Sequence, residues 1–216
     1  YRTSALKQGR RGVVVSVELE LAVGGADGAA SLSAPVAYAQ LASALGVQLG
    51  DRMPLAEVRR AVLHLRAAKG MVLSADDPDS VSAGSFFTNP IVSGGFAATL
   101  PADAPRWPQE VEQSEALVVP LDSFVPGELA FRRAHAEQDA VKLSAAWLIE
   151  HSGVTRGFSL PGSGAAISSK HTLALVNLGS ATASDIAELA RYVQSRVLSQ
   201  YGVILQPEPV LVGVHL

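Results

Sequence analysis

The alternation of apolar and polar residues predicts one strand and two helices in the first third of the chain. Over residues 13–21 every second residue is valine or leucine and the intervening ones are largely serine and glutamate, the pattern of a strand with one buried face. Residues 35–45 and 54–69 instead carry apolar residues at helical spacing. Because glycine commonly ends a helix, we expect these helices to stop at Gly46 and Gly70.

The remaining chain is predicted to be loop-rich as far as residue 126 and more regular after it. Residues 74–90 and 101–126 lack a periodic apolar pattern and are rich in Asp, Gly and Pro, so we expect loops there. A helix is predicted over residues 142–150, and a second begins at Thr182, which can form a capping box with Asp185. Its buried stripe is expected to be Ile186, Leu189, Ala190, Val193 and Val197. Short strands are predicted over 172–177, 203–205 and 210–214, and the mixture indicates an α+β fold.

Composition narrows the class of protein. The 216 residues are 48% hydrophobic and 17% charged, which is enough for a substantial core. A formal net charge of -3 gives no electrostatic footprint for nucleic acid, and no apolar run reaches the roughly 20 residues of a membrane helix. The chain has no cysteine, and its five histidines lack metal-binding spacing, so we expect neither disulfides nor a metal.

Two polar segments could bind or transform a ligand. In Gly84–Pro90 (GSFFTNP), Ser85 could be a hydroxyl donor held in place by two buried phenylalanines; the alternative is a turn whose phenylalanines fill the core. Lys142 is expected at the start of a helix, where the macrodipole disfavours a cation. A residue that breaks such a rule serves a ligand more often than others do, although a solvated lysine is the simpler interpretation.

Two further segments are weaker candidates. Gly162–Ala166 (GSGAA) resembles half of a dinucleotide-binding loop, but it leads into a strand instead of a helix, so we assign it no cofactor. Glu208 lies between Pro207 and Pro209 in a stiff, extended stretch, for which a surface turn is the alternative. For each of the four segments considered alone, a structural role explains the residues at least as well as a role in binding or catalysis does.

Taken in order, these segments resemble the UDP-N-acetylenolpyruvoylglucosamine reductases. The similarity covers nearly the whole chain and is most specific in Gly84–Pro90 and in Lys142–Glu150 (KLSAAWLIE). The segment Lys69–Leu73 is similar to the actinobacterial branch of the family. The other matching positions are Tyr1–Ser4 with Lys7, Tyr38, Arg66–Lys69 and Leu205–Glu208.

The resemblance implies reduction of UDP-N-acetylglucosamine enolpyruvate to UDP-N-acetylmuramate in peptidoglycan synthesis. In that family NADPH reduces FAD, the flavin passes hydride to C3 of the enolpyruvyl ether, and an acid protonates C2. By motif match, Ser85 is the proton donor, while Arg2 and Glu208 flank the substrate carboxylate and the enolate-like intermediate. The positions expected to contact the UDP-sugar are Tyr38, Lys69, Asn89 and Lys142, and Arg66 is expected to contact the cofactor.

The resemblance also implies a domain organisation. Residues 1–70 are expected to end the second FAD-binding lobe, residues 71–200 to form the substrate-binding domain, and residues 201–216 to return to an N-terminal FAD lobe. The chain begins at a tyrosine, so we expect that lobe to lie upstream and the chain alone to be inactive. The family further implies a cytoplasmic monomer that binds neither nucleic acid nor a membrane.

The sequence departs from enterobacterial members of the family in two places. A longer loop replaces their short Lys-Leu-Pro-Asp run after Lys69, and Val210 replaces a basic residue. The competing hypothesis is a non-catalytic UDP-sugar-binding module that lacks the flavin lobe. A serine hydrolase centred on Ser85 has little support because the G-x-S-x-G motif is absent and no histidine is expected to pair with Ser85.

Overall fold

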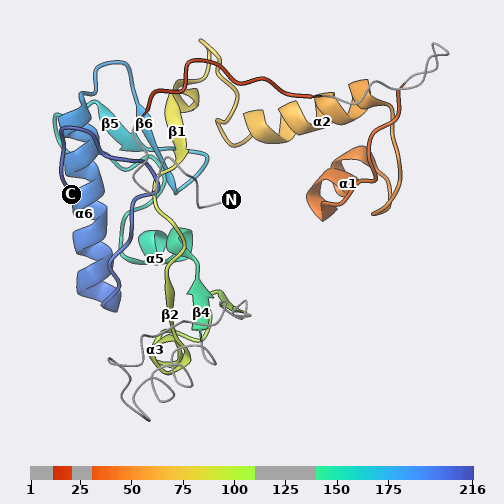
Figure 1. Ribbon diagram of the computed structural model, residues 1–216. Helices are drawn as coiled ribbons and strands as arrows, with labels where there is room; N and C mark the ends of the chain where they lie inside the picture. Colours follow the sequence, from red (N-terminus) through yellow and green to blue (C-terminus); the bar gives the residue numbers. More distant parts are fainter. Residues whose placement is uncertain (1–11, 21–30, 110–139) are drawn as a thin grey trace, which may run out of the picture. The chain divides into compact units, whose positions relative to one another are not determined.

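The chain forms two compact units, Tyr1–Leu73 and Ser74–Leu216. A computed structural model describes residues 12–20, 31–109 and 140–216 (Figure 1). The elements combine helices with small antiparallel sheets, which confirms the predicted α+β class.

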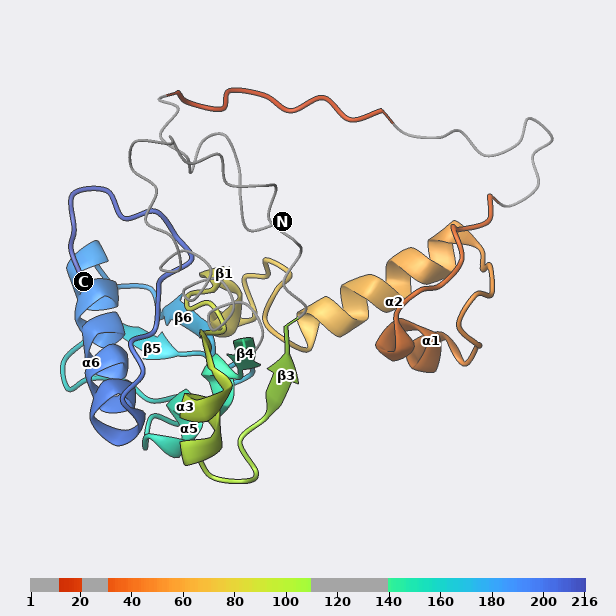
Figure 2. The same cartoon turned by 60° about the horizontal axis from the view of Figure 1, so that its bottom comes forward.

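The first unit contains two helices that pack against each other, α1 (Ala39–Leu45) and α2 (Leu55–Ala67) (Figure 2). Gly46 ends α1 in the left-handed region with φ 70°, and its N–H donates to the carbonyl oxygens of Ala42 and Ser43. Gly70 has φ 69° and reverses the chain after α2. Both predicted helices are therefore confirmed, although each is shorter than expected.

The strand expected over residues 13–21 is wrong for residues 13–20, which have no regular structure. Val13 and Val15 are 89% and 92% exposed. An alternating pattern becomes a strand only where a neighbouring strand supplies backbone partners and a core covers the apolar face. Within the described ranges, no strand pairs with this segment.

The second unit contains two three-stranded antiparallel sheets. The first has the order β1-β6-β5, from Ser82–Ser85, Ala174–Asn177 and Ala165–Ile167. The second has the order β2-β4-β3, from Ile91–Ser93, Ala140–Leu143 and Arg106–Pro108. A 3-10 turn, η1 (Pro78–Ser80), precedes β1.

Strands β1 and β3 lie where loops were expected, so the prediction of loops over 74–90 and 101–109 is wrong in these places. Strand β1 consists only of Ser, Ala and Gly, and β3 ends at a proline. Such residues carry no alternating apolar signal, because both strands are held by backbone pairing to more apolar partners. Residues 110–126 of the second predicted loop lie outside the described residues.

Helix α5 (Ala145–His151) begins three residues later than predicted. Ser144 is its N-cap, and the Ser144 hydroxyl accepts a hydrogen bond from the Trp147 N–H at 3.2 Å. Lys142 therefore belongs to β4, and its expected position at a helix start is wrong. The physical reason is the cap, since the residue whose side chain accepts the first free N–H groups determines where a helix begins.

Helix α6 (Ala183–Tyr201) has the predicted capping box between Thr182 and Asp185, and Gly202 ends it with φ 69°. It packs against β5, β6 and α5, and another short helix, α3 (Gly94–Thr99), follows β2 (Figure 1). The stripe predicted to be buried is largely confirmed: Leu189, Ala190, Val193 and Val197 are buried, and Ile186 is half-buried.

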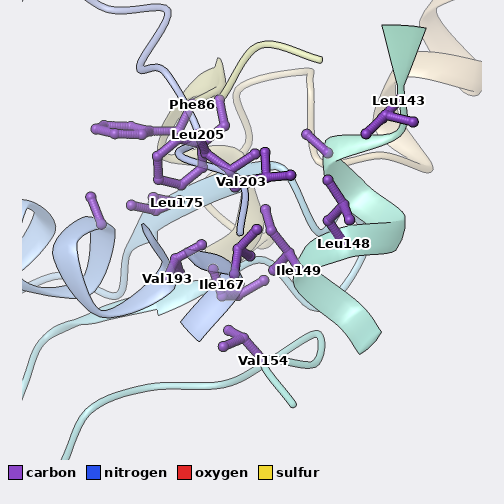
Figure 3. Close-up of a cluster of buried hydrophobic side chains, with 14 of the residues drawn as sticks. Phe86, Leu143, Leu148, Ile149, Val154, Ile167, Leu175, Val193, Val203 and Leu205 are labelled. Atoms are coloured by element: carbon purple, nitrogen blue, oxygen red, sulfur yellow. The ribbon is translucent and has the colours of Figure 1, made fainter. Parts of the chain in front are cut away.

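The segment after α6 forms no strand over 203–205 or 210–214, which corrects both expectations. Val203 and Leu205 are nevertheless 4% and 0% exposed and fill the core between the sheet and the helices (Figure 3). The apolar residues that alternate at 203 and 205 are therefore buried, as expected, but they do not belong to a strand. Val210 and Val212 are exposed.

Candidate functional site

Ser85 ends β1 and is followed by two buried aromatic residues. Phe86 and Phe87 are 6% and 1% exposed, and their rings meet edge to face with centroids 5.0 Å apart. Gly84, in the left-handed region with φ 84°, directs the chain into this position. The phenylalanines do fill the core, as the structural alternative required, and in doing so they hold the half-buried Ser85 at the edge of the sheet.

The segment 206–208 lies antiparallel beside the residues that follow Ser85. The Thr88 N–H donates to the Gln206 carbonyl at 2.9 Å, and the Glu208 N–H donates to the Phe86 carbonyl at 2.8 Å. Phe87 and Pro207 form an isolated bridge between these two bonds. Glu208 is half-buried at a bend there, and its backbone lies beside that of the residue after Ser85.

A histidine contacts Ser85, which corrects the expectation that no histidine pairs with this serine. The Ser85 Oγ lies 3.3 Å from Nε2 of His171, in the loop that leads into β6. Spacing along the chain could not reveal this contact, because the antiparallel pairing of Ser85 with Ala174 brings the two residues together.

Asn89 and Lys142 are brought together by the pairing of β2 with β4. The Asn89 Oδ1 accepts a hydrogen bond from the Ala145 N–H at 3.0 Å, and Lys142 pairs in register with Ile91. The Lys142 ammonium lies 6.0 Å from the centroid of the Trp107 ring, the outer limit of a cation–π contact. Within the described residues, the Asn89 amide nitrogen has no hydrogen-bond partner.

The other residues predicted for the site lie in the first unit or outside the described residues. Tyr38 is 75% exposed at the N-terminus of α1, and the Lys69 ammonium donates to Gln40 Oε1 at 3.4 Å. Arg66 is exposed in the last turn of α2. Arg2 lies outside the described residues. The convergence of Tyr38 and Lys69 with the residues of the second unit therefore stays a prediction.

A buried carboxylate anchors the loop that carries His171. The Asp79 carboxylate accepts hydrogen bonds from the Ser169 N–H at 2.8 Å and from the Ser169 hydroxyl at 2.5 Å. Burial by itself raises the pKa of Asp79. The hydrogen bonds from Ser169 outweigh it and, helped by Ser168 and the Lys170 charge, hold the pKa below its usual value.

The glycine-rich segment 162–166 does not fit a nucleotide phosphate. A Cβ placed on Gly164 would lie 2.6 Å from the backbone nitrogen of Ala181 and 2.6 Å from the Ser180 hydroxyl. Glycine is thus required at 164 for packing against residues 180–181, and the segment continues into β5 instead of a helix. These residues provide no cradle for the pyrophosphate of FAD.

Comparison with known proteins decides the family. Residues 77–212 match the family described as UDP-N-acetylenolpyruvoylglucosamine reductase, C-terminal domain. The chain belongs to this family. The resemblance inferred from GSFFTNP and KLSAAWLIE is thereby confirmed.

Three relatives, all named UDP-N-acetylenolpyruvoylglucosamine reductase, align with the whole of this chain. The protein of Leifsonia xyli subsp. xyli is 61% identical over 225 residues, which are 57% of its own length. Those of Corynebacterium jeikeium and Nocardia farcinica are 44% and 45% identical over half of their lengths. The chain thus spans about half the length of the curated reductases that it matches, and these come from actinobacteria, as the Lys69–Leu73 segment indicated.

No helix in the described ranges has both the length and the apolar character needed to cross a membrane. Over the same residues, no three or more His, Cys, Asp or Glu side chains cluster as a metal site would require.

Proposed function

We propose that this chain supplies the substrate-binding half of an enzyme that reduces UDP-N-acetylglucosamine enolpyruvate to UDP-N-acetylmuramate. The observation that carries the proposal is the convergence of Ser85, its contact His171 and the backbone of Glu208 at one edge of the β1-β6-β5 sheet. Family membership over residues 77–212 supports it, because the relatives are named for this substrate.

In the proposed reaction, C3 of the enolpyruvyl ether receives a hydride and C2 receives a proton from the Ser85 hydroxyl. A serine is a weak acid, but a carbanion-like C2 is a strong base, so a hydroxyl at this position can serve as the donor. Hydride addition moves negative charge onto the substrate carboxylate. A guanidinium at Arg2 then stabilises the transition state more than the ground state. Glu208 needs a proton or a hydrogen bond there to avoid repelling that charge.

The UDP diphosphate is proposed to bind Tyr38, Lys69, Asn89 and Lys142. Two ammonium groups, a phenol and an amide match the charge and acceptors of a diphosphate. The Asn89 and Lys142 half of this set has support from the β2–β4 pairing. The exposure of Tyr38 and of the Lys69 ammonium leaves both accessible to a ligand.

FAD and NADPH are the proposed cofactors, and the flavin supplies the hydride when it is bound. The glycine-rich segment 162–166 is packed against 180–181, so the pyrophosphate is assigned to a part of the full-length reductase that precedes this chain. Residues 1–70 are proposed to end an FAD-binding lobe in which Arg66 contacts the cofactor, residues 71–200 to bind the substrate, and residues 201–216 to return to the flavin side. The enzyme is further proposed to be a cytoplasmic monomer without a nucleic-acid or membrane partner.

The decisive experiment uses the full-length protein. We expect it to be purified with flavin absorbance and to oxidise NADPH when UDP-N-acetylglucosamine enolpyruvate is added, but not when UDP-N-acetylglucosamine is added. We expect this chain alone to bind the substrate without retaining FAD through gel filtration. A colourless full-length protein that binds the substrate and never oxidises NADPH would favour the non-catalytic binding module.

A further inference from the structure

We propose that His171 positions the Ser85 hydroxyl and stabilises the charge left on Oγ when that hydroxyl gives up its proton. The inference rests on the proposed role of Ser85 as the proton donor. Its starting point is the 3.3 Å separation of the Ser85 Oγ from the His171 Nε2, a contact between a strand end and a loop from distant parts of the chain.

The direction of this hydrogen bond follows from the role of the serine. A hydroxyl has a single proton, and a proton donor must direct that proton towards the substrate carbon. The Oγ lone pair is then left to accept, so the His171 ring donates through Nε2–H. In the opposite arrangement the hydroxyl proton points at the ring and away from the substrate, and Ser85 cannot act as an acid.

The backbone of His171 is held by a buried serine on one side and by β6 on the other. The Ser168 side chain is fully buried, and its Oγ accepts hydrogen bonds from the Lys170 N–H at 3.1 Å and from the His171 N–H at 3.2 Å. The His171 carbonyl accepts from the Ala174 N–H at 2.9 Å. Donor and acceptor groups of the histidine backbone are therefore both occupied, which fixes the main chain from which the ring extends.

The residues on each side of His171 are anchored to other elements. Before it, the Ser169 N–H and hydroxyl donate to Asp79, and Lys170 pairs with Asp77 at 2.8 Å. After it, the buried Thr172 hydroxyl donates to the Glu150 carboxylate of α5. A loop tied at both ends in this way keeps a side chain in place without reorganisation during the reaction, which is what electrostatic stabilisation of a transition state requires.

Ser85 is held to the same loop. The Phe86 N–H donates to the Leu173 carbonyl at 2.7 Å, so the backbone next to Ser85 is fixed to the backbone two residues after His171. Both partners of the 3.3 Å contact thus lie on one hydrogen-bonded framework. The separation between Oγ and Nε2 is set by sheet pairing and not by side-chain flexibility alone.

The chemical step balances without a further reactant. The Oγ–H bond of Ser85 breaks as a C–H bond forms at C2, and the electron pair of the broken bond stays on Oγ. The hydride added at C3 is the one that a bound flavin would supply in the proposed function. The Nε2–H donor of His171 stabilises the alkoxide, which recovers its proton from water after the product leaves.

The test uses the full-length reductase with its flavin and rapid mixing of each half-reaction. We expect His171→Ala to slow the oxidation of reduced flavin by substrate about 100-fold, the loss typical of removing one preorganised donor. Reduction of the flavin by NADPH and the substrate Kd should stay within about twofold of wild type, because neither includes the proton transfer from Ser85. His171→Gln places a side-chain N–H where Nε2–H was, and we expect it to recover at least about tenfold of the lost rate, a large part of one donor's contribution.

A double-mutant cycle separates positioning from general damage. If His171 acts through Ser85, His171→Ala should cause no further slowing in a Ser85→Ala background. His215→Ala, which removes an exposed histidine whose carbonyl accepts from Arg191, is the matched control and should behave as wild type.

Three results would overturn the inference while leaving the proposed function standing: a normal oxidative half-reaction in His171→Ala, an equal loss in both half-reactions, or an equal loss with and without Ser85. A His171→Gln variant as slow as His171→Ala despite an unchanged Tm would also count against it. If the wild-type reductase fails to transfer hydride to the enolpyruvyl substrate, the proposed function itself fails and the inference with it.

Discussion

The backbone N–H of Glu208 donates a 2.8 Å hydrogen bond to the carbonyl oxygen of Phe86, the residue that follows Ser85. Two residues with proposed chemical roles are thus brought together by main-chain groups. A backbone hydrogen bond does not depend on the identity of the side chain, so this main-chain contact can persist when either residue is replaced. Substitutions at Ser85 and Glu208 should therefore leave this backbone link between the two segments in place.

Replacement of Ser85 by alanine should separate the two half-reactions of the full-length enzyme. We expect flavin reduction by NADPH to stay nearly unchanged, because no proton from Ser85 is needed in that step. Oxidation of the reduced flavin by substrate should slow by roughly 10²–10⁴, the usual contribution of general acid catalysis. Stopped-flow absorbance of the flavin measures both rates, and equal slowing of the two would contradict the assignment.

Removal of the Lys142 charge should weaken substrate binding. Lys142→Met keeps an unbranched apolar side chain near the Trp107 ring but loses the ammonium, so it tests the charge without removing the packing. A charge-assisted contact contributes about 1.5–3 kcal/mol, which corresponds to a substrate Kd raised about 10- to 150-fold. Isothermal titration with the enolpyruvyl substrate measures the change.

For Lys142 the competing interpretation is a solvated lysine. It predicts a change of less than about twofold in Kd, well under the energy of one hydrogen bond. The NADPH half-reaction, which involves no UDP group, is the internal control and should be unaffected.

The Asn89 amide is expected to have two roles: its oxygen stabilises the fold, and its nitrogen binds the ligand. Its Oδ1 accepts from the Ala145 N–H. Asn89→Asp keeps that acceptor but loses the amide N–H donors and adds a negative charge beside the proposed diphosphate. We expect stability to change by less than about 0.5 kcal/mol and the substrate Kd to rise by at least about tenfold.

Asn89→Ala is the companion variant, because it removes both functions. It should lower the free energy of unfolding by about 1–2 kcal/mol as well, since the Ala145 N–H at the start of α5 loses its acceptor. Urea unfolding and substrate titration of the two variants distinguish these effects. Unchanged substrate affinity in Asn89→Asp would limit Asn89 to its structural contact.

The Asp79 carboxylate should make stability depend on pH in the acid range. Its pKa is lower in the folded chain than in the unfolded chain, so the unfolded chain binds more protons and stability rises with pH. The contribution is present above the unfolded pKa of about 3.9 and is lost as the pH falls through the folded value. Asp79→Asn should lower the unfolding free energy at neutral pH by about 1–3 kcal/mol.

Between pH 6 and pH 3, the unfolding free energy of Asp79→Asn should therefore fall less steeply than that of the unchanged chain. Urea titrations at several pH values measure this difference. Parallel slopes for the two proteins would show that the Asp79–Ser169 contact does not contribute to the acid sensitivity.

Sequence patterns predicted the elements that depend on local interactions. The capping box of Thr182 and Asp185, the stripe of α6 and the glycine stops at Gly46 and Gly70 all follow from contacts within a few residues. The strands of the two sheets were harder. Strand β1 has no apolar alternation, and its pairing partner β6 lies far along the chain, so nothing in its own residues marks it as a strand.

The candidate site was predictable only in part for the same reason. The motif match identified Ser85, Asn89, Lys142 and Glu208, and the pairing of the segments around them is consistent with a common site. His171 was missed because its relation to Ser85 depends on the register of β1 with β6. The start of α5 was misplaced because the Ser144 cap outweighs the helical spacing of the residues before it.

The position of Val203 and Leu205 in the core has a consequence for how the protein is made. These two side chains and the bonds from 206–208 to 86–88 come from residues that are synthesised after every helix and strand of the second unit. Until they emerge from the ribosome, Phe86 and Phe87 lack the cover that Val203 and Leu205 provide, and residues 86–88 lack their backbone bonds to 206–208. Pairing between such distant segments is slow to form and leaves apolar surface exposed meanwhile. Nascent chains arrested before residue 203 should therefore recruit chaperones and be sensitive to proteases.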